Sequence, residues 1–343
     1  MAHYAGLDVS LKETAVCVVD EAGKRVFEGK LPTDPACLAR VLRSRAPEAV
    51  RIGLESGPTS AWLCATLRQE GLPVVCLDAR QAHAALSLRP NKSDQNDARG
   101  LAEIVRMGWF REVQVKSLST HERRALLAAR HRLVETRVGL DNQLRGILKT
   151  FGLVIGPSNS TNLARRAEAL TQGHPGLAAI VSPLLAVRTS LLEQIAVFDR
   201  AVGQLIRDDD TVRRLMTVPG VGPITALAFI TAIEDPARFT HARDVGAYFG
   251  LTPTRYQSGE TDRAGRISKC GDPFTRKCLY EAAGVLITKV QRWSPLKAWG
   301  VRLLQHAGGK KAKVAVARKL AVILHRIWTD GTEFWWTKET ATA

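Results

Sequence analysis

The order of the apolar runs in the first 110 residues constrains the fold more than any other feature. Turn residues separate three consecutive strand-like runs: 3–8, 14–20 and 25–31. Strand-like and helical patterns follow: 38–42 (helical), 49–55 (strand), 61–70 (helical), 73–77 (strand), 79–88 (helical) and 94–107 (helical). Strands that alternate with helices pair in parallel. We therefore expect a mixed sheet that opens with a three-strand meander and continues with parallel strands.

Three domains are expected, and together they place the chain in an α/β plus all-α class. Residues 1–112 fit the ribonuclease-H-like arrangement, in which a meander opens a mixed sheet. Residues 113–208 hold two long helical patterns, 119–150 and 183–207, with a Gly-, Pro-, Ser- and Asn-rich connection around 152–162. These patterns indicate an antiparallel coiled-coil arm for self-association, RNA contact or spacing. Residues 209–343 are predicted to be a mainly helical domain.

Four acidic residues mark a candidate metal site. Asp8 closes the first strand-like run and Glu55 closes the fourth, each two residues after a glycine. Asp94 and Asp97 lie three residues apart where a helix begins. Two strand-end carboxylates and a helical i, i+3 pair can converge on one point, and their oxygens suit hard divalent cations. Taken singly, each acid has a structural alternative as a cap or in an ion pair with a nearby arginine.

The net charge of +16 is unevenly spread and predicts a polyanionic partner. Residues 1–110 have 14 Lys and Arg against 13 Asp and Glu, whereas residues 111–343 have 35 against 20. A near-neutral acidic domain followed by a basic remainder indicates a catalytic unit attached to a nucleic-acid-binding one. A solvated basic surface is the alternative. The six cysteines form no Cys-x-x-Cys pattern, which disfavours a zinc site or a disulfide framework.

A glycine turn opens the C-terminal domain. Residues 218–226 read Val-Pro-Gly-Val-Gly-Pro-Ile-Thr-Ala, which predicts a helix-hairpin-helix element. Gly220 and Gly222 allow a phosphate to approach the backbone N–H groups where the second helix begins. The alternative is a plain turn between two helices.

Ser258 is the candidate nucleophile. It precedes Gly259 in what we expect to be an exposed loop, and four cationic residues follow it: Arg263, Arg266, Lys269 and Arg276. Such cations would stabilise the charge that develops in phosphoryl transfer. A serine needs a base or a metal to become nucleophilic, so the local pattern alone favours a turn residue. Ser268 is the competing serine.

Two groups of motifs resemble the transposases of the IS110 family, with its IS1111 subgroup, over nearly the whole chain. The N-terminal part resembles that family's RuvC-like domain at Gly-Leu-Asp-Val-Ser (6–10), Leu-Glu-Ser (54–56) and Lys-Ser-Asp-Gln-Asn-Asp-Ala (92–98). The C-terminal part resembles its transposase domain at 219–223, at 248–253 and from Gln257 to Gly271. The chain departs from the usual Ser-Gly-Gly by having Glu260, and Cys270 replaces a basic residue.

The resemblance implies specific roles. Asp8, Glu55, Asp94 and Asp97 become ligands of two Mg²⁺ ions, with Mn²⁺ as a substitute, and Ser258 becomes the attacking hydroxyl. The implied activity is RNA-guided DNA recombination through a serine-linked DNA intermediate. The implied partners are donor and target DNA, a structured non-coding guide (bridge) RNA, and further copies of the chain in a dimer or tetramer with a composite active site.

The same resemblance and the basic charge indicate which residues contact nucleic acid. The predicted contacts are Gly220, Gly222, Arg255, Arg263, Arg266, Lys269, Arg276, Arg123, Arg130, Lys310, Lys311 and Lys313. These cationic residues suit backbone phosphate, since no element reads bases in an obvious way. Each cluster has a solvated face as its alternative. The aromatic run 334–336 either packs on the last helix or stacks on nucleic acid.

Other functions were weighed against recombination. A RuvC-like hydrolytic nuclease, such as a junction resolvase, would use the acids with water and not need Ser258. An actin-like ATPase or sugar kinase would need a second Asp-Gly loop, for which 330–332 is the candidate. A non-catalytic binding protein is disfavoured because four acids cost affinity for a polyanion unless metal compensates. The N-terminal pattern and the lack of a run of about 18 apolar residues predict a cytoplasmic protein without a membrane segment.

Overall fold

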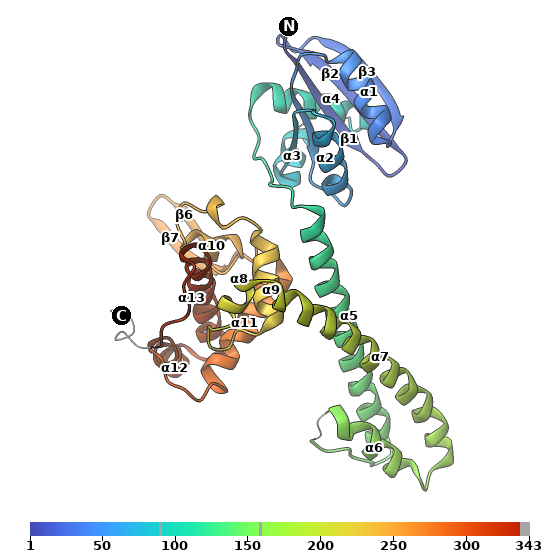
Figure 1. Cartoon of the computed structure of the whole chain (residues 1–343), viewed down its shortest axis with the longest axis vertical. Helices are drawn as coiled ribbons and strands as arrows, with labels where there is room; N and C mark the ends of the chain where they lie inside the picture. Colours follow the sequence, from blue (N-terminus) through green and yellow to red (C-terminus); the bar gives the residue numbers. More distant parts are fainter. Residues whose placement is uncertain (89–90, 158–159, 337–343) are drawn as a thin grey trace. The chain divides into compact units, whose positions relative to one another are not determined.

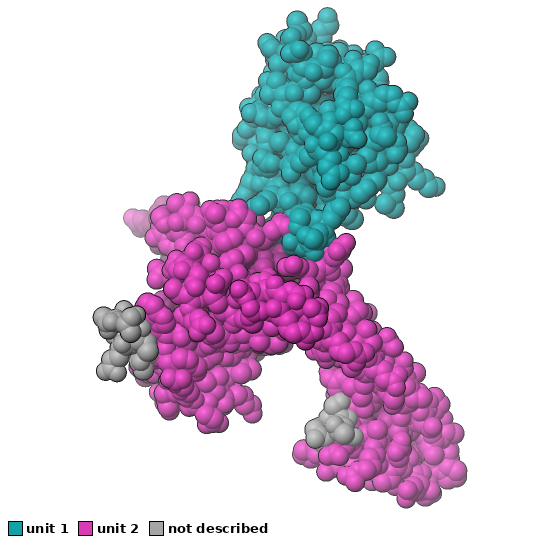
Figure 2. Space-filling model, viewed as in Figure 1, with its two compact units in different colours: residues 1–121 teal, residues 122–343 magenta. Residues whose placement is uncertain are grey.

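The computed structural model describes residues 1–88, 91–157 and 160–336, with the backbone alone at 160 and 161. Contacts divide the chain into two compact units, residues 1–121 and 122–343 (Figure 2). The first unit ends nine residues after the expected boundary at 112. The finer division into an arm and a C-terminal domain at 208/209 stays a prediction.

The first unit is built on a five-stranded mixed sheet, as predicted (Figure 1). Its strands are β1 (His3–Val9), β2 (Glu13–Asp20), β3 (Arg25–Pro32), β4 (Ala49–Glu55) and β5 (Val74–Leu77). They lie in the order β3-β2-β1-β4-β5. The pairs β1–β2 and β2–β3 are antiparallel, whereas β1–β4 and β4–β5 are parallel. The meander and the parallel section are thus confirmed, in a ribonuclease-H-like order.

Helices cover both faces of this sheet. They are α1 (Pro35–Arg45), α2 (Ser60–Gln69), α3 (Ala79–Leu86) and α4 (Asp94–Met107). Side chains alternate along β1, so Leu7 packs with Leu38 of α1 and Leu63 of α2 on one face. On the other face, Cys17 of β2 packs with Ala98 of α4. Leu101 of α4 packs beside Leu77 and Ala82. Helix α4 therefore covers this second face of the sheet.

Two 33-residue helices follow: α5 (Leu118–Thr150), whose first turn belongs to the first unit, and α7 (Pro175–Arg207). Arg188 donates a hydrogen bond to Asp141, and Arg130, earlier in α5, donates one to Asp199, later in α7. The two helices therefore run antiparallel. Between them lies α6 (Ser160–Thr171), where the sequence indicated only a connection. The packing of Leu148 with Leu163 and Val181 joins the three helices. The three helices therefore pack together, and the coiled-coil arm stays a prediction.

Helix α7 differs from its prediction in two ways. It begins at Pro175 rather than 183, because buried Leu177 and Val181 hold the turns before 183 against their neighbours, even though Pro183 lies inside the helix. It is also the one helix in the described ranges that is long and apolar enough to cross a membrane, with a mean hydropathy of 1.5. Arg188 of this helix is buried and forms an ion pair with Asp141 of α5, so its charge is compensated within the protein.

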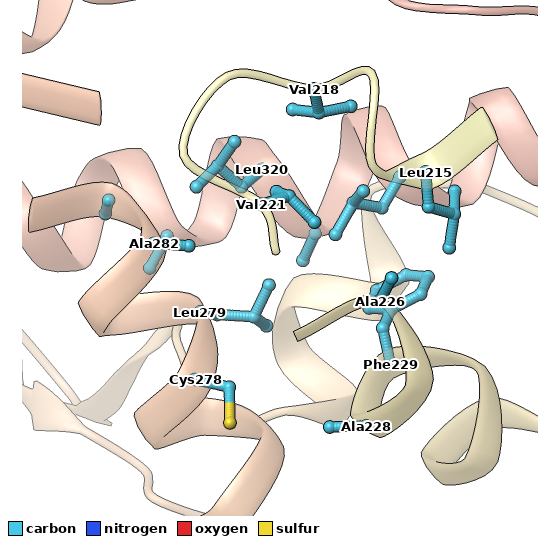
Figure 3. Packing of buried hydrophobic residues seen from close by; sticks show 14 of the residues in the cluster. Leu215, Val218, Val221, Ala226, Ala228, Phe229, Cys278, Leu279, Ala282 and Leu320 are labelled. Atoms are coloured by element: carbon cyan, nitrogen blue, oxygen red, sulfur yellow. The ribbon is translucent and has the colours of Figure 1, made fainter. Parts of the chain in front are cut away.

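The remainder is mainly helical, as predicted, with one exception. Its helices are α8 (Asp210–Leu215), α9 (Pro223–Ile233), the 3₁₀ helix η1 (Pro236–Arg238), α10 (Asp244–Tyr248), α11 (Pro273–Thr288), α12 (Pro295–Ala307) and α13 (Gly309–Asp330). Helix α9 is buried along most of its length, and Phe229 packs in one cluster with Leu279 of α11 and Leu320 of α13 (Figure 3). The exception is a β-hairpin, β6 (Pro253–Ser258) and β7 (Thr261–Ile267), which the sequence analysis missed.

The glycine turn lies between α8 and α9, and its assignment as a helix-hairpin-helix element stays a prediction. Gly220 has a φ of +87°, and a Cβ there would lie 2.5 Å from the carbonyl oxygen of Ala282. This glycine is therefore required for close packing on α11. Gly222 precedes α9 and has open space around its missing Cβ. Phosphate binding at this turn stays a prediction, for which Gly222 is the accessible position.

Candidate active site

The sheet register places Asp8 and Glu55 together. In the parallel pair β1–β4, Gly6 lies opposite Gly53 and Leu7 opposite Leu54, so the acids follow at the same edge. Successive side chains on a strand point to opposite faces. Asp8 therefore shares the face of Gly6, and Glu55 that of Gly53. Both strand-end carboxylates point to the side covered by α4.

The two glycines bring α4 onto the sheet. A Cβ on Gly6 would lie 2.1 Å from the carbonyl oxygen of Ala98 and 2.3 Å from the nitrogen of Ala102. A Cβ on Gly53 would lie 2.5 Å from Cγ1 of Val105. The space beside the strand-end acids is thus filled by helix backbone rather than left open. This close approach holds the first turn of α4 next to the strand ends.

The first turn of α4 supplies the other two acids, and they behave differently. Ser93 caps the helix by accepting a hydrogen bond from the nitrogen of Asn96 at 3.2 Å. Asp97 lines a pocket of about 230 Å³ together with Asp8 and Glu55. Asp94 instead accepts a hydrogen bond from Nζ of Lys30 at 2.6 Å, and its side chain is 61% exposed. Three of the four predicted acids therefore share one pocket, and the fourth is held by Lys30.

The shared pocket also contains two basic residues that the sequence analysis did not assign. His83 of α3 and Lys92, just before α4, line it with the three acids. Both lower the pKa of Glu55, against the larger opposing effects of burial and of the other acids. His83 gave no sequence signal, because a single histidine in an apolar helical stretch is usually a core residue. Lys92 lies in the Lys-Ser-Asp motif, which did point to this region.

Burial and mutual repulsion raise the pKa of both strand-end acids. The pKa of Asp8 lies above its ordinary value because of burial first, and then because of the charges of Asp97 and Asp94. Burial, followed by the charges of Asp8 and Asp97, does the same for Glu55. The hydrogen bond from Lys30 lowers the pKa of Asp94. Clustered carboxylates that repel one another are stabilised by a cation.

This donor set fits a hard divalent cation, because its three pocket carboxylates are oxygen ligands whose repulsion a cation would relieve. Within the described residues, no three Asp, Glu, His or Cys side chains are already close enough to hold one ion. The acids therefore line the site without forming a closed ligand set. Metal binding would require their side chains to draw together and Asp94 to leave Lys30. The ligand roles stay a prediction.

Ser258 lies at the tip of the hairpin rather than in the expected loop. It is the last residue of β6 and lies opposite Thr261, with Gly259 and Glu260 as the two-residue turn. Gly259 has a φ of +55°, which the first turn position of a type II′ hairpin requires. Every residue of β6 is exposed, so the hydroxyl of Ser258 is accessible. Tyr256 shares its face two residues earlier, and Arg263 lies opposite Tyr256.

The cations around Ser258 are not equally available. Arg255 forms two hydrogen bonds to Asp262, at 2.9 and 2.7 Å. Nη1 of Arg276 donates to the carbonyl oxygen of Cys270 at 2.8 Å and so holds the chain after the hairpin. Arg263, Arg266 and Lys269 are exposed. The competing Ser268 is half-buried, and its Oγ accepts a bond from the nitrogen of Cys270 at 3.4 Å.

Other predicted nucleic-acid contacts lie on the long helices and on α13. Two of them have acidic partners: Arg130 bonds Asp199, and Arg123 lies 3.8 Å from Asp209. Lys313 lies over the ring of Tyr280, whereas Lys310 and Lys311 are exposed at the start of α13. Phe334 packs against the hydrophobic core, and Cζ of Arg292 lies 4.4 Å from the centroid of the Trp336 ring. Part of the aromatic run therefore packs on the domain.

Comparison with known proteins identifies the family. Residues 5–152 match a model described as a transposase of the DEDD type in IS110 elements, and residues 212–297 match the transposase IS116/IS110/IS902 family model. The transposase for insertion sequence element IS1328 of Yersinia enterocolitica is 30% identical over 251 residues, which cover 72% of this chain and 75% of that one. The chain belongs to the IS116/IS110/IS902 family of transposases.

The chain is also similar to one further transposase and, in part, to a solved structure. The transposase for insertion sequence element IS1111A of Coxiella burnetii is 27% identical over 336 residues, covering 94% of this chain and 89% of that one. Among solved structures, the Thermus thermophilus RuvC structure is 18% identical and covers 32% of this chain, with a TM-score of 0.26. As an IS110-family transposase, the protein is an enzyme that cuts and rejoins DNA. The resemblance that the motifs indicated is thereby confirmed.

Proposed function

We propose that this transposase is an RNA-guided DNA recombinase that uses Mg²⁺ at the acid pocket and Ser258 as its nucleophile. The observation that carries the proposal is the shared pocket of Asp8, Glu55 and Asp97 at the ends of two parallel strands. A cluster of partly buried carboxylates in a chain of net charge +16 has no use in simple polyanion binding.

The acids hold the ions in this proposal. Asp8, Glu55 and Asp97 bind from the pocket, and Asp94 joins them when it leaves Lys30. When bound, two Mg²⁺ ions, or Mn²⁺ in their place, stabilise charge on the oxygens around the reacting phosphorus. Lys92 lies in the same pocket and offers a cation to a non-bridging phosphate oxygen.

Ser258 carries the covalent chemistry. Its Oγ attacks the phosphorus of the DNA backbone, the bond from phosphorus to the leaving sugar oxygen breaks, and the serine proton passes to solvent while the sugar oxygen gains one. In the second step a sugar hydroxyl of another strand attacks the phosphoserine and restores the free serine. The number of phosphodiester bonds is conserved, so no energy source is needed. Exposure of Ser258 at a hairpin tip supports this role.

Partner molecules complete the machinery. The acids belong to residues 1–121 and Ser258 to residues 122–343, and we propose that Ser258 of one protomer completes the acid pocket of another in a dimer or tetramer. A structured non-coding RNA selects donor and target DNA by base pairing. Exposed cations of the second unit, such as Arg263, Lys310 and Lys311, bind the backbones.

Strand exchange on defined donor and target DNA tests the proposal. The full chain, with RNA transcribed from the DNA that flanks its gene, should recombine the two DNAs with Mg²⁺ and not with EDTA. Ser258→Ala and Asp8→Asn should each abolish recombination, while Ser268→Ala serves as the matched serine control and retains it. Recombination by Ser258→Ala at the wild-type rate would contradict the proposed nucleophile.

A metal-dependent hydrolytic nuclease is the second candidate. It is favoured by one observation: three acids, His83 and Lys92 line one pocket within the first unit. Such an enzyme would release nicked DNA with water as the nucleophile. Denaturing electrophoresis separates the two functions, because the recombinase leaves protein covalently attached to DNA and the nuclease leaves only free nicked strands.

A further inference from the structure

The hairpin formed by β6 and β7 buries very little of its own surface (Figure 1). Every residue of β6 is exposed, and so is every residue of β7 except Ile267. Its base is held by two backbone hydrogen bonds, from Ser268 N to the oxygen of Thr252 at 2.9 Å and from Lys269 N to the oxygen of Gly250 at 3.2 Å. A two-stranded hairpin with so little packing is marginally stable in water. Both of its faces are therefore open to a ligand.

The pairing register decides which side chains share a face. Tyr256 lies opposite Arg263 and Ser258 opposite Thr261, and these pairs alternate with two others. Successive side chains on a strand point to opposite faces. One face therefore carries Arg255, Gln257, Asp262 and Ala264. The other face, which we call the serine face, carries Tyr256, Ser258, Thr261 and Arg263.

The two faces differ in how their charges are satisfied. On the first face, Arg255 forms two hydrogen bonds to Asp262, at 2.9 and 2.7 Å, so cation and anion compensate each other. On the serine face, Arg263 forms no ion pair with a carboxylate of the described residues. A guanidinium without an acidic partner is suited to bind a phosphate. The serine face is therefore the side of the hairpin that attracts a nucleic-acid backbone.

The serine face also presents an aromatic ring. Tyr256 is 69% exposed. Cross-strand geometry places its Cβ about 5 Å from that of Arg263, and two strand residues place it about 7 Å along the hairpin from Ser258. Nucleic-acid bases stack on such rings whatever their sequence. Within a duplex each base is already covered on both sides, so an exposed tyrosine selects an unpaired base.

We propose that the serine face binds single-stranded DNA, with Tyr256 stacked on one base and Arg263 bound to an adjacent phosphate. The ligand is DNA because this transposase cuts and rejoins DNA, and strands that are exchanged leave their duplex. Stacking fixes the position of the strand along the hairpin. Tyr256 is thus a positioning residue that determines which phosphate lies at Ser258. The positioning role rests on the proposed nucleophile, whereas the binding site does not.

Binding of the full chain to a fluorescent oligothymidine in EDTA tests the site without any cutting. Tyr256→Ala should raise the Kd about tenfold, the loss expected for one stacked base, and should leave the salt dependence unchanged because no charge is removed. Tyr256→Phe keeps the ring and should bind like the wild type. Arg263→Gln should instead reduce the slope of log K against log salt by about 0.7, which is one phosphate contact on a single strand.

Gln257→Ala is the matched control, because Gln257 is exposed on the same strand and points to the opposite face. It should bind the oligonucleotide like the wild type. Tyr256→Ala should leave the affinity for duplex DNA unchanged. An equal loss for duplex DNA would overturn the stacking, and a larger loss for single-stranded RNA than for DNA would overturn the choice of ligand. No loss beyond that of Gln257→Ala would overturn the site.

Photocrosslinking locates the contact directly. An oligonucleotide containing 5-iodouracil, irradiated on the wild-type protein and analysed by mass spectrometry, should be attached to Tyr256. Attachment to other residues alone would overturn the stacking.

The positioning role is read from the DNA that becomes attached to Ser258. With Mg²⁺, guide RNA and donor DNA, the wild type should be attached at one phosphate, and Tyr256→Ala at neighbouring phosphates as well. Attachment of Tyr256→Ala at the wild-type phosphate alone would overturn this role. Absence of any Ser258 adduct from the wild type would contradict the proposed nucleophile and the positioning role together, while the binding and crosslinking results would still decide whether the site exists.

Discussion

Nζ of Lys30 lies 2.6 Å from Oδ2 of Asp94, and this ion pair holds one of the four candidate metal ligands away from the other three. The two residues are 64 positions apart and lie on β3 and at the start of α4. A metal ion that recruits Asp94 must therefore compete with Lys30.

Replacing Lys30 should strengthen metal binding. Lys30→Gln frees Asp94, and because exposed ion pairs are weak we expect an affinity gain of about two- to fivefold. Titration of the free protein with Mn²⁺, followed by electron paramagnetic resonance, measures this without DNA. Lys24→Gln removes an equal charge from an exposed position in the first unit and should leave the affinity unchanged. Weaker Mn²⁺ binding by Lys30→Gln would contradict the competition.

Neutralising a strand-end acid should stabilise the metal-free protein. Burial and neighbouring acids raise the pKa of Asp8 above its unfolded value near 3.8, so folding takes up protons between the two values. The free energy of unfolding therefore falls as the pH rises through that window, and the penalty remains at neutral pH. In EDTA at pH 7, Asp8→Asn should raise the unfolding temperature, and the gain should vanish below the unfolded pKa.

Glu48→Gln is the matched control for this experiment, because Glu48 is exposed and precedes β4, whose opposite end carries Glu55. Scanning calorimetry of both variants from pH 3 to 7 gives the comparison. A destabilising effect of Asp8→Asn in EDTA at pH 7 would show that the acids do not repel one another as described.

A methyl group at Gly6 should disturb the packing of α4 on the sheet and so displace Asp97 from the acid pocket. In Gly6→Ala the added Cβ would lie 2.1 Å from a backbone oxygen of α4, which cannot move without shifting the helix. Overpacking of this kind costs about 1–3 kcal/mol or more of unfolding free energy, and it should also weaken Mn²⁺ binding. Gly57→Ala, where nothing lies within 4 Å of the added methyl, should be close to neutral in urea unfolding.

The arm should depend on its buried ion pair. Arg188 is 2% exposed and Asp141 is 8% exposed, and Asp141 also accepts a bond from Arg137 at 2.7 Å. Asp141→Ala removes the carboxylate that pairs with buried Arg188, which should cost about 3–5 kcal/mol in urea unfolding. Arg43→Ala breaks an exposed pair with Glu70 and should cost about 1 kcal/mol or less. Similar costs for the two variants would argue against a buried pair.

The sequence predicted those parts of the molecule whose causes are local. Turn residues and apolar runs were enough to predict the succession of strands and helices. Because parallel strands end at the same edge, Asp8 and Glu55 were then expected to lie close together. The hairpin that bears Ser258 was missed because all of β6 is exposed and polar, so it lacks the alternation that marks a half-buried strand. The early start of α7 was missed because Pro183 resembles a helix N-terminus.

Long-range contacts were beyond prediction. No local pattern pairs Lys30 with Asp94 across 64 residues, or brings His83 into the acid pocket. The position of Gly6 two residues before Asp8 was visible in the sequence, but the backbone of α4 that lies against this glycine was not.

Mapping the covalent adduct tests the central claim most directly. Wild-type protein is incubated with donor DNA, guide RNA and Mg²⁺, denatured, digested with protease and nuclease, and analysed by mass spectrometry. The account predicts a nucleotide mass on the peptide containing Ser258, absent from Ser258→Ala and from samples with EDTA. A nucleotide on Ser268 or another residue, or recombined DNA with no adduct at any time point, would contradict it.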